Sequence, residues 1–355
     1  MHTSTEPLVI NGSYGEGGSH HFRVALSMSA LTGIPVRIHS IRGGTRKPGM
    51  MADDFAFFRA LEEITSARVQ GDELRSNEVT FAPKHRPKPF RGVVDVQEFE
   101  KGLQPGNAVV LGQALIPILA RAGGYSQFKV HGETYNTNTL TYDVFEKQTL
   151  AAYRQQGVYA WCRQLQSGFG YATHGEVEFE VEPSVMLPLQ FDQRGELVAL
   201  RATITICDIA ASIAERGAKL AEAELKEMYP QAEADIIEVA GSSPGVFVSI
   251  TGNFERGFGS GVAMGSRGVR METVTRNAID QFHQWYKTGA SVDPFLIDQL
   301  LLSAVLADGD SCFTTSCLTR RVISQAWVIK QFMPVQITIL GRENEPATIR
   351  ISKTY

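Results

Sequence analysis

A short glycine-rich segment near the amino end of the sequence contains the residue types that bind phosphate groups. Residues 11–23 are Asn-Gly-Ser-Tyr-Gly-Glu-Gly-Gly-Ser-His-His-Phe-Arg. Glycines let backbone amides turn toward an anion without obstruction by a Cβ atom, and arginine can bind phosphate through two nitrogen donors. A helix is predicted to begin near Ser19 and to end at Gly33, so the positive end of its dipole would point at the same ligand. The segment therefore predicts a cradle for an oxyanion, most simply a phosphate.

A carboxylate and a second basic stretch extend this pattern. Glu16 lies among the glycines, where a carboxylate would be useful mainly for holding a metal ion or a ribose hydroxyl. Arg42, Arg46 and Lys47 follow the next predicted strand. A tight turn that leads into a helix would explain the glycines equally well, so this segment alone does not establish a site.

The composition is that of a globular protein with no general excess of basic residues. The chain has 355 residues, of which 43% are hydrophobic, and its 34 basic and 38 acidic side chains give a net charge of −4. Any contact with nucleic acid must therefore come from a local patch. The length suggests a large domain with a smaller one, or two domains.

The cysteines and the start of the chain predict a cytoplasmic protein. Cys162, Cys207, Cys312 and Cys317 form no Cys-x-x-Cys pair, which is typical of reduced thiols. The first residues lack the features of a signal peptide, and no stretch has the apolar length of a membrane span. We expect no membrane partner.

One local pattern occurs three times in the chain. An apolar helix is followed by a glycine and then by a short strand of alternating residues. The three copies are residues 25–33 with 35–41, residues 113–124 with 126–131, and residues 299–309 with 311–316. The repeats predict a large domain built from three similar helix–sheet units.

Several segments of the sequence resemble the RNA 3'-terminal phosphate cyclase family. The likeness begins with the glycine segment and Arg23 and then includes residues 31–35, 41–42, 47–49, 104–106, 132–134, 298–300 and 332–335. It therefore spans nearly the whole chain.

The resemblance implies an α/β (α+β) fold like that of the cyclases and enolpyruvate transferases. Such a fold has a large domain of three repeated units and a small α/β domain inserted between the second and third. We therefore expect the large domain to comprise residues 1–183 and 280–355, and the small domain to comprise residues 184–279. The pattern also predicts a long helix over 142–161, and it predicts that the helix through Ile279 and Trp285 resumes the large domain.

The resemblance also implies a reaction. Cyclases of this family use ATP and magnesium to convert the 3'-phosphate of an RNA into a 2',3'-cyclic phosphate. A histidine first attacks ATP to form an adenylylated enzyme, AMP passes to the RNA phosphate, and the neighbouring 2'-hydroxyl then displaces AMP. The implied partners are an RNA 3' end and ATP, and magnesium and arginines would neutralise the developing charge.

The site residues implied by the resemblance fall into three groups. The catalytic positions are Glu16, which would also hold the metal, Arg23, Arg42 and Asp298. The nucleotide-binding positions are Gly15, Gly17, Gly18, Pro105, Gly106 and Gln299. The phosphate of the substrate would be bound by Arg46, Lys47, Arg320 and Arg321.

The histidine that carries the adenylyl group in the family is absent here. Counted from either side, its position falls on Arg320 or Arg321, and no histidine occurs between Gln284 and Tyr355. Arginine stays protonated and cannot act as a nucleophile. The Gly-Gln pair that the family has after the glycine segment is replaced by Ser19-His20, so His20 is one candidate substitute and Cys317 another. The alternative is that His20 is an ordinary hydrogen-bonding or core histidine.

Two functions are compatible with these observations. The first is ATP-dependent cyclisation of an RNA 3'-phosphate. The second is RNA-end binding or ribonucleoprotein assembly by a paralogue that lost the nucleophile. The retained residues Glu16, Arg23, Arg42 and Asp298 favour the first, and an arginine in place of the histidine, Arg320 or Arg321, favours the second.

Overall fold

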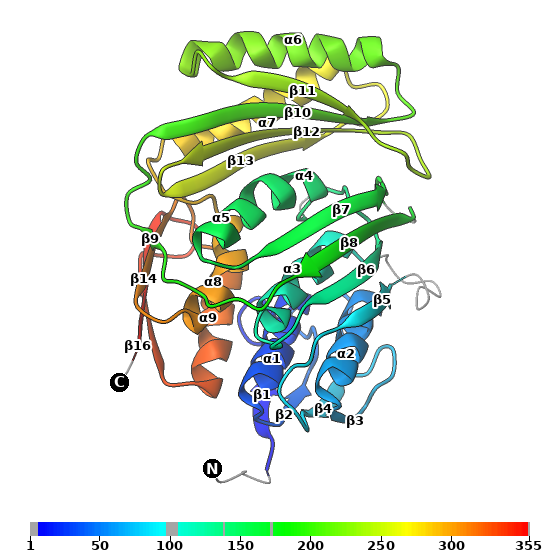
Figure 1. Ribbon diagram of the computed structural model, residues 1–355, viewed down its shortest axis with the longest axis vertical. Coiled ribbons are helices and arrows are strands. Elements are labelled where there is room, and N and C mark those ends of the chain that lie inside the picture. The colour runs from blue at the N-terminus through cyan, green and yellow to red at the C-terminus, as the bar shows by residue number, and fades with distance from the viewer. Residues whose placement is uncertain (1–5, 97–105, 138, 171–172, 354–355) are drawn as a thin grey trace.

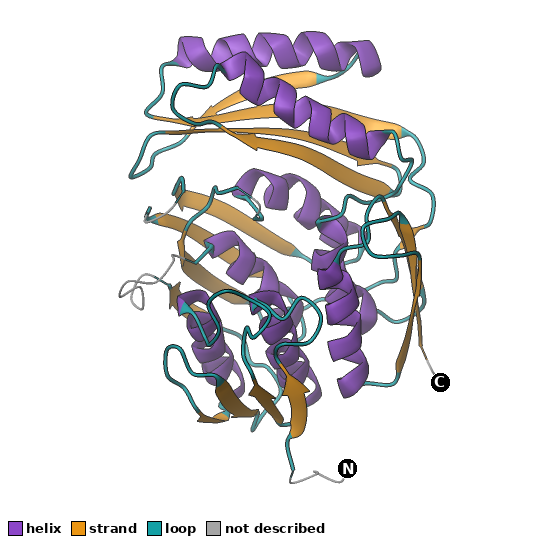
Figure 2. Cartoon of the chain, turned by 180° about the vertical axis from the view of Figure 1, so that it is seen from behind, coloured by secondary structure: helices purple, strands orange, loops and turns teal. Residues whose placement is uncertain are grey.

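The computed structural model describes residues 6–96, 106–137, 139–170 and 173–353, and the structural statements below refer to these residues. They form four sheets of four strands each (Figures 1 and 2). Three of the sheets, each with two helical segments, make up a large part. The fourth sheet and its two helices make up a smaller part at one end of the molecule.

The first unit of the large part follows the order strand, helix, strand, helix, strand, strand. Its elements are β1 (Leu8–Asn11), α1 (Ser19–Thr32), β2 (Val36–His39), α2 (Ala52–Thr65), β3 (Arg68–Gln70) and β4 (Glu78–Ala82). The strand order is β1-β2-β4-β3, with β1 and β2 parallel and the other neighbours antiparallel. Helix α1 begins at Ser19 and is followed by Gly33 at φ 75°, as predicted.

The second unit repeats this arrangement. Its elements are β5 (Arg91–Asp95), α3 (Ala108–Leu119), β6 (Ser126–Gly132), α4 (Tyr142–Val144), the π-helical turn η2 (Phe145–Thr149), α5 (Leu150–Gln155), β7 (Ala160–Gln166) and β8 (Gly175–Val181). The prediction of one long helix over 142–161 was wrong at its end. Gly157 adopts φ 75°, which ends the helical region, and the chain enters β7 at Ala160.

The third unit has the same strand order although its elements are far apart in sequence. It contains β9 (Gln190–Phe191), α8 (Leu296–Leu306), β14 (Ser311–Thr315), α9 (Arg320–Phe332), β15 (Val335–Leu340) and β16 (Ala347–Lys353). β9 is parallel to β14, as β1 is to β2 and β5 to β6. The three repeats predicted from the sequence correspond to α1 with β2, α3 with β6, and α8 with β14, so the predicted fold class is confirmed.

The smaller part is inserted within the third unit, after its first strand, rather than between the second and third units. It contains β10 (Leu197–Cys207), α6 (Ala211–Met228), β11 (Glu233–Glu238), β12 (Gly245–Phe254), β13 (Gly257–Met264) and α7 (Met271–Tyr286), with strand order β11-β10-β12-β13. Both helices cover the same face of this sheet (Figure 2).

Helix α7 belongs to the smaller part, so the expected boundary between residues 279 and 280 falls inside it. Phe282 and Trp285 are buried in the hydrophobic cluster of the small sheet. Gly259 and Gly261 of β13 allow the close approach, because a Cβ atom on Gly259 would lie 2.4 Å from the Trp285 ring and one on Gly261 would lie 2.1 Å from the Ala278 carbonyl oxygen. The helix expected to resume the large domain is therefore packed elsewhere.

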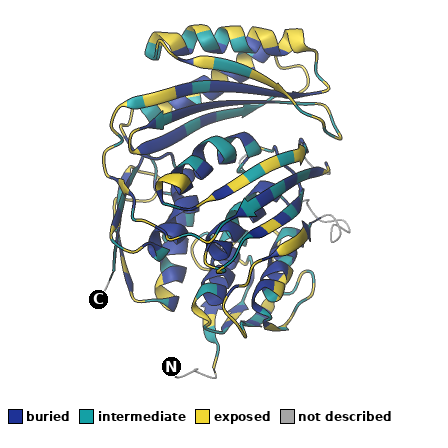
Figure 3. Cartoon of the chain, viewed as in Figure 1, coloured by how far each residue is buried: buried dark blue, intermediate teal, exposed yellow. Residues whose placement is uncertain are grey.

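The two parts have separate hydrophobic cores, and Figure 3 shows buried residues on the strands and helices of both. In the large part, α1 packs against α2, α3 and α9, and α3 packs against α8. Helices α1, α3 and α8 thus hold equivalent places in the three units.

Among the described residues, none of the helices combines the length and apolar character needed to cross a membrane.

Candidate functional site

A cavity of about 450 Å³ lies at the amino-terminal ends of these three equivalent helices. From the large part it is lined by His20 and Arg23 of α1, Gly106, Asn107 and Val110 at α3, and Leu296, Asp298 and Gln299 of α8. From the smaller part it is lined by Phe247, Ser260, Val262, Ala263, Met264 and Gln281. The first turn of a helix leaves amide N–H groups without intrahelical partners, and three such ends at one cavity favour an anionic ligand.

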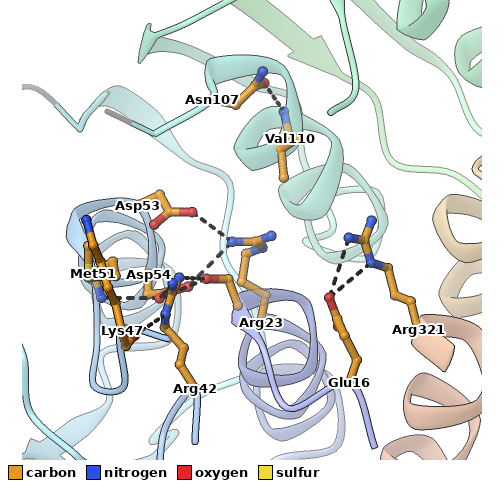
Figure 4. A network of polar contacts seen from close by, with 11 residues as sticks. Glu16, Arg23, Arg42, Lys47, Met51, Asp53, Asp54, Asn107, Val110 and Arg321 are labelled. Atoms are coloured by element: carbon orange, nitrogen blue, oxygen red, sulfur yellow. Dashed lines mark hydrogen bonds and ion pairs between the residues drawn. The ribbon is translucent and has the colours of Figure 1, made fainter. Parts of the chain in front are cut away.

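Arg321 joins two carboxylates at this cavity. Its Nη1 lies 3.2 Å from Oδ2 of Asp298. Its Nε lies 3.4 Å from Oε1 of Glu16, a contact that Figure 4 shows. The Glu16 amide donates a hydrogen bond of 2.7 Å to Oγ of Ser324, one turn further along α9. Residues from the glycine segment, α8 and α9 are therefore held together by charge and hydrogen bonding.

Burial changes the acidity of Asp298. It raises the pKa of this carboxyl to about 6, although Arg321 acts in the opposite direction. The charge of Arg321 is itself supported by its neighbours, because Asp298 and Glu16 raise its pKa despite the opposing effect of burial. Asp298 can thus change its protonation state near neutral pH while Arg321 stays charged.

A second ion-pair network holds Arg23 at the cavity. Nη1 of Arg23 lies 3.1 Å from Oδ2 of Asp53 and 3.5 Å from Oδ1 of Asp54 (Figure 4). Arg42 pairs with the other oxygen of Asp54 at 3.5 Å and donates to Oγ of Ser19. Burial raises the pKa of Asp54 to about 7, helped by Asp53 and opposed by Arg23 and Arg42. Asp54 therefore connects the arginine in the cavity to an arginine behind it.

The glycines Gly15, Gly17 and Gly18 lie outside the cavity lining, and Gly15 and Gly17 allow the loops beside the cavity to pack closely. Gly17 has φ 57°, and a Cβ atom there would lie 2.8 Å from the Ser13 carbonyl oxygen and 2.9 Å from the Gly44 nitrogen. Gly15 has φ 62°, and a Cβ atom there would lie 2.1 Å from Oγ of Ser324. The two loops are also joined by a hydrogen bond of 3.1 Å from the Gly44 amide to the Gly17 carbonyl. These glycines permit a close packing of loops that a larger residue would prevent.

The structure brings together some of the expected site residues and separates others. Arg23, Asp298, Gln299, Gly106, Arg321 and His20 line the cavity. Gly15, Gly17, Gly18, Arg42, Arg46, Lys47 and Arg320 are not among its lining residues, and Glu16 reaches it through Arg321. Pro105 lies outside the described residues. Arg320 is exposed and pairs with Glu343 at 2.9 Å, so of the two arginines at the position of the family histidine only Arg321 faces the site.

Sequence reasoning missed several residues of the cavity wall. Asn107 caps α3 by accepting a hydrogen bond of 2.9 Å from the Val110 amide (Figure 4). Glu133 is buried and accepts a hydrogen bond of 2.7 Å from Asn136. The resemblance included residues 132–134 without giving Glu133 a role, and an asparagine directly before an apolar helix is a recognisable cap. The capping asparagine and the family likeness at residues 132–134 were therefore both visible in the sequence.

Hydrogen bonds hold the smaller part over the cavity. The buried carboxylate of Asp143 accepts bonds from the Tyr135 hydroxyl at 2.8 Å and from the Thr205 hydroxyl of β10 at 2.6 Å. On another side, the Ser260 amide and hydroxyl donate to Asp293 at 3.0 and 2.9 Å. These contacts connect the second and third units to the small sheet.

Comparison with known proteins establishes the family. The model of the RNA 3'-terminal phosphate cyclase family matches residues 14–339. The chain belongs to this family. Proteins named RNA 3'-terminal phosphate cyclase resemble it over nearly their whole length. The one from Nostoc punctiforme is 32% identical over 331 residues, which are 93% of this chain and 95% of the relative.

Relatives from other organisms agree with this assignment to the cyclase family. The cyclase of Methylococcus capsulatus is 30% identical over 97% of this chain and 96% of its own, and that of Methanopyrus kandleri is 32% identical over 96% and 97%. Among solved structures, the enolpyruvyl transferase NikO from Streptomyces tendae aligns over 97% of this chain and 48% of its own, with 10% identity and a TM-score of 0.36. The fold assignment rests on the repeated sheet order and not on that alignment.

Proposed function

We propose that this protein uses ATP to convert the 3'-phosphate of an RNA into a 2',3'-cyclic phosphate. The observation that carries the proposal is the cavity at the ends of three helices, which is lined by Arg23 and by the ion pair of Arg321 with Asp298. Its relatives that span nearly the whole chain are named for this activity. The cavity supplies what the reaction requires, namely positive charge for phosphates and a group that can accept a proton.

Each side of the cavity has a role in this proposal. Arg23 and Arg321, with the helix ends, hold the phosphates of the two substrates. Asp298, with its raised pKa, accepts the proton of the attacking 2'-hydroxyl. Phe295 lies at the cavity and is 53% exposed, so it offers a ring face on which a base can stack.

A magnesium ion fits the site only if the phosphates of the nucleotide supply part of its ligands. The described residues contain no cluster of three or more side chains suited to a metal, and Arg321 already pairs with Glu16 and Asp298. The other carboxylate oxygen of Glu16, Oε2, is buried and makes no hydrogen bond in the described structure. Magnesium is commonly held by one or two carboxylates together with substrate phosphates, so this oxygen is the protein ligand that we propose. The bound ion would neutralise phosphate charge.

The cellular setting that we propose is RNA processing or repair in the cytoplasm. The four cysteines are free thiols in the structure, as expected in a reducing compartment. The partners of this reaction are an RNA 3' end and ATP, whose phosphates would be bound by the two arginines of the described cavity lining, Arg23 and Arg321.

The proposal is tested with a short RNA that carries a 3'-phosphate. Incubation with ATP and magnesium should make the terminal phosphate resistant to phosphatase. Asp298→Asn should slow this conversion on the order of 100-fold. Asp308→Asn is the matched control, because Asp308 is exposed just beyond the other end of α8. RNA that binds but is not converted would contradict the proposal and would favour a non-catalytic RNA-end-binding protein.

A further inference from the structure

The first step of the proposed reaction needs a nucleophile, and α9 does not supply it. At the position where the resemblance places the family histidine, the cavity contains Arg321, which is engaged with Asp298 and Glu16. A guanidinium stays protonated and does not attack phosphorus. If AMP becomes attached to this protein, another side chain must accept it.

The cavity wall contains few alternatives. Among the described lining residues there is no lysine or cysteine, and His20 is the only histidine. Of the hydroxyl groups, that of Ser260 donates to Asp293. Side-chain amides are poor nucleophiles, and the two arginines are charged. His20 therefore carries the basic nitrogen best suited to attack in the described wall.

His20 is held in the uncharged form that a nucleophile requires. Burial lowers the pKa of its imidazole well below the usual value, and Arg321 of α9 and then Arg23 of α1 act in the same direction, with a smaller effect from His21. Gln325 of α9 has the opposite effect. At neutral pH the ring therefore has a nitrogen lone pair available.

The neighbourhood of His20 also determines which nitrogen is available. Nε2 of His20 is buried without a hydrogen bond, and so is Oε1 of Gln325, whose side chain lies beside the ring. Two adjacent buried polar atoms without partners are costly, and a hydrogen bond from Nε2–H to Oε1 would satisfy both. In that tautomer Nδ1 carries the lone pair, so it would be the nitrogen that attacks a nucleotide bound in the cavity.

We propose that His20 is the residue that accepts AMP from ATP in this protein, with Gln325 positioning the ring; this inference rests on the proposed function. Nδ1 of His20 attacks the α-phosphorus of ATP, and a nitrogen–phosphorus bond forms. The bond from that phosphorus to the bridging oxygen breaks, and pyrophosphate leaves with the electron pair. The proton on Nε2 stays on the ring, facing Gln325.

Two further displacements complete the cycle. An oxygen of the RNA 3'-phosphate attacks the adenylyl phosphorus, and the electron pair of the nitrogen–phosphorus bond returns to Nδ1. The 2'-oxygen then attacks the RNA phosphorus, its proton passes to Asp298, and AMP leaves. His20 is regenerated unchanged, and ATP is the only co-reactant consumed.

The test is to incubate the full-length protein with radiolabelled ATP and magnesium, without RNA, and to locate any bound AMP by peptide mass spectrometry. A phosphoramidate is labile in acid and stable in alkali, which distinguishes it from an ester. We expect the label on His20 and a loss on the order of 1,000-fold in His20→Gln, which introduces the amide that the family has at this position. His85→Gln is the control, because His85 is exposed and lies outside the cavity lining.

The outcomes separate the inference from the proposed function. Label on another residue, label that persists in His20→Gln, or cyclisation without an adenylylated protein would overturn the role of His20 and leave the proposed function intact. Absence of both label and cyclised RNA would overturn both. Thermal unfolding of His20→Gln and His20→Asn shows whether a loss of label comes from misfolding. Peptide mass spectrometry of the labelled, unsubstituted protein locates the bound AMP without the use of any variant.

Discussion

Nη1 of Arg321 lies 3.2 Å from Oδ2 of Asp298, so the first turn of α9 and the first turn of α8 are joined by an ion pair at the cavity. The same guanidinium lies 3.4 Å from Glu16, which precedes it by 305 residues in the sequence. In this protein an arginine occupies the place where the family resemblance implies a histidine. Its expected role is to bind phosphate and to hold Asp298 in position.

Replacement of this arginine should therefore reduce turnover. Arg321→Ala removes a positive charge from the phosphate site and leaves Asp298 without its partner, so kcat/KM for RNA cyclisation should fall on the order of 100-fold. Arg320→Ala is the matched control, since the neighbouring arginine is exposed and pairs with Glu343. Equal losses in the two variants would show that general positive charge on α9, rather than the Arg321 contact, is what matters.

Cyclisation should also depend on pH through Asp298. Burial raises the pKa of this carboxyl to about 6, and only the ionised form accepts a proton, so the rate should be lost as the pH falls through about 6. Arg321 lowers this pKa, so the midpoint in Arg321→Ala should move to higher pH. The measurement is kcat/KM against pH for both proteins. A midpoint that does not move would mean that another group controls the profile.

The carboxylate of Asp54 is expected to matter for stability. It is fully buried between Arg23 and Arg42 and also accepts a hydrogen bond of 3.2 Å from the Met51 amide. Asp54→Ala leaves both guanidinium groups without this partner, and the free energy of unfolding should fall by about 3 kcal/mol. The measurement is denaturant unfolding at about pH 8, where most of this carboxyl is ionised, because burial raises its pKa to about 7.

A surface aspartate provides the comparison for Asp54. Asp72 pairs with Arg59 at 3.3 Å, and the two side chains are 42% and 47% exposed. Asp72→Ala should change the free energy of unfolding by less than about 1 kcal/mol. Similar effects of the two substitutions would contradict the importance assigned to the buried network.

The connection between the two parts of the molecule can be tested on a single strand. Thr205 of β10 donates a 2.6 Å hydrogen bond to the buried Asp143, so Thr205→Val should lower the free energy of unfolding by about 2 kcal/mol. Thr203 on the same strand is also buried, but its hydroxyl makes no hydrogen bond in the described structure. Thr203→Val should be neutral or slightly stabilising. Both values come from denaturant unfolding, and the reverse order would show that the bond to Asp143 is not stabilising.

Much of the large part could be predicted because its pattern is local. The apolar stretches that became α1, α3 and α8 are each followed by a glycine and a short strand, and these signals depend only on neighbouring residues. The placement of α7 could not be predicted in the same way. Its apolar residues show which face is buried, but not that Gly259 and Gly261 of β13 provide the surface against which it packs.

The site was predicted in part for a similar reason. Arg23 and Asp298 were recognised from motifs and line the cavity. Arg42 belongs to an equally plausible motif, but its guanidinium is directed to Asp54 and Ser19. The direction of a long side chain depends on partners from other segments, which spacing in the sequence does not reveal. The same limit applied to Arg321, whose contact with Glu16 exists only in the folded chain.

The most direct test of the central proposal follows one labelled phosphate at the 3' end of an RNA. After incubation with the protein, ATP and magnesium, nuclease digestion should release the label as a nucleoside 2',3'-cyclic phosphate. Release of the label as an ordinary 3'-phosphate, under conditions in which the RNA is shown to be bound, would contradict the proposed activity.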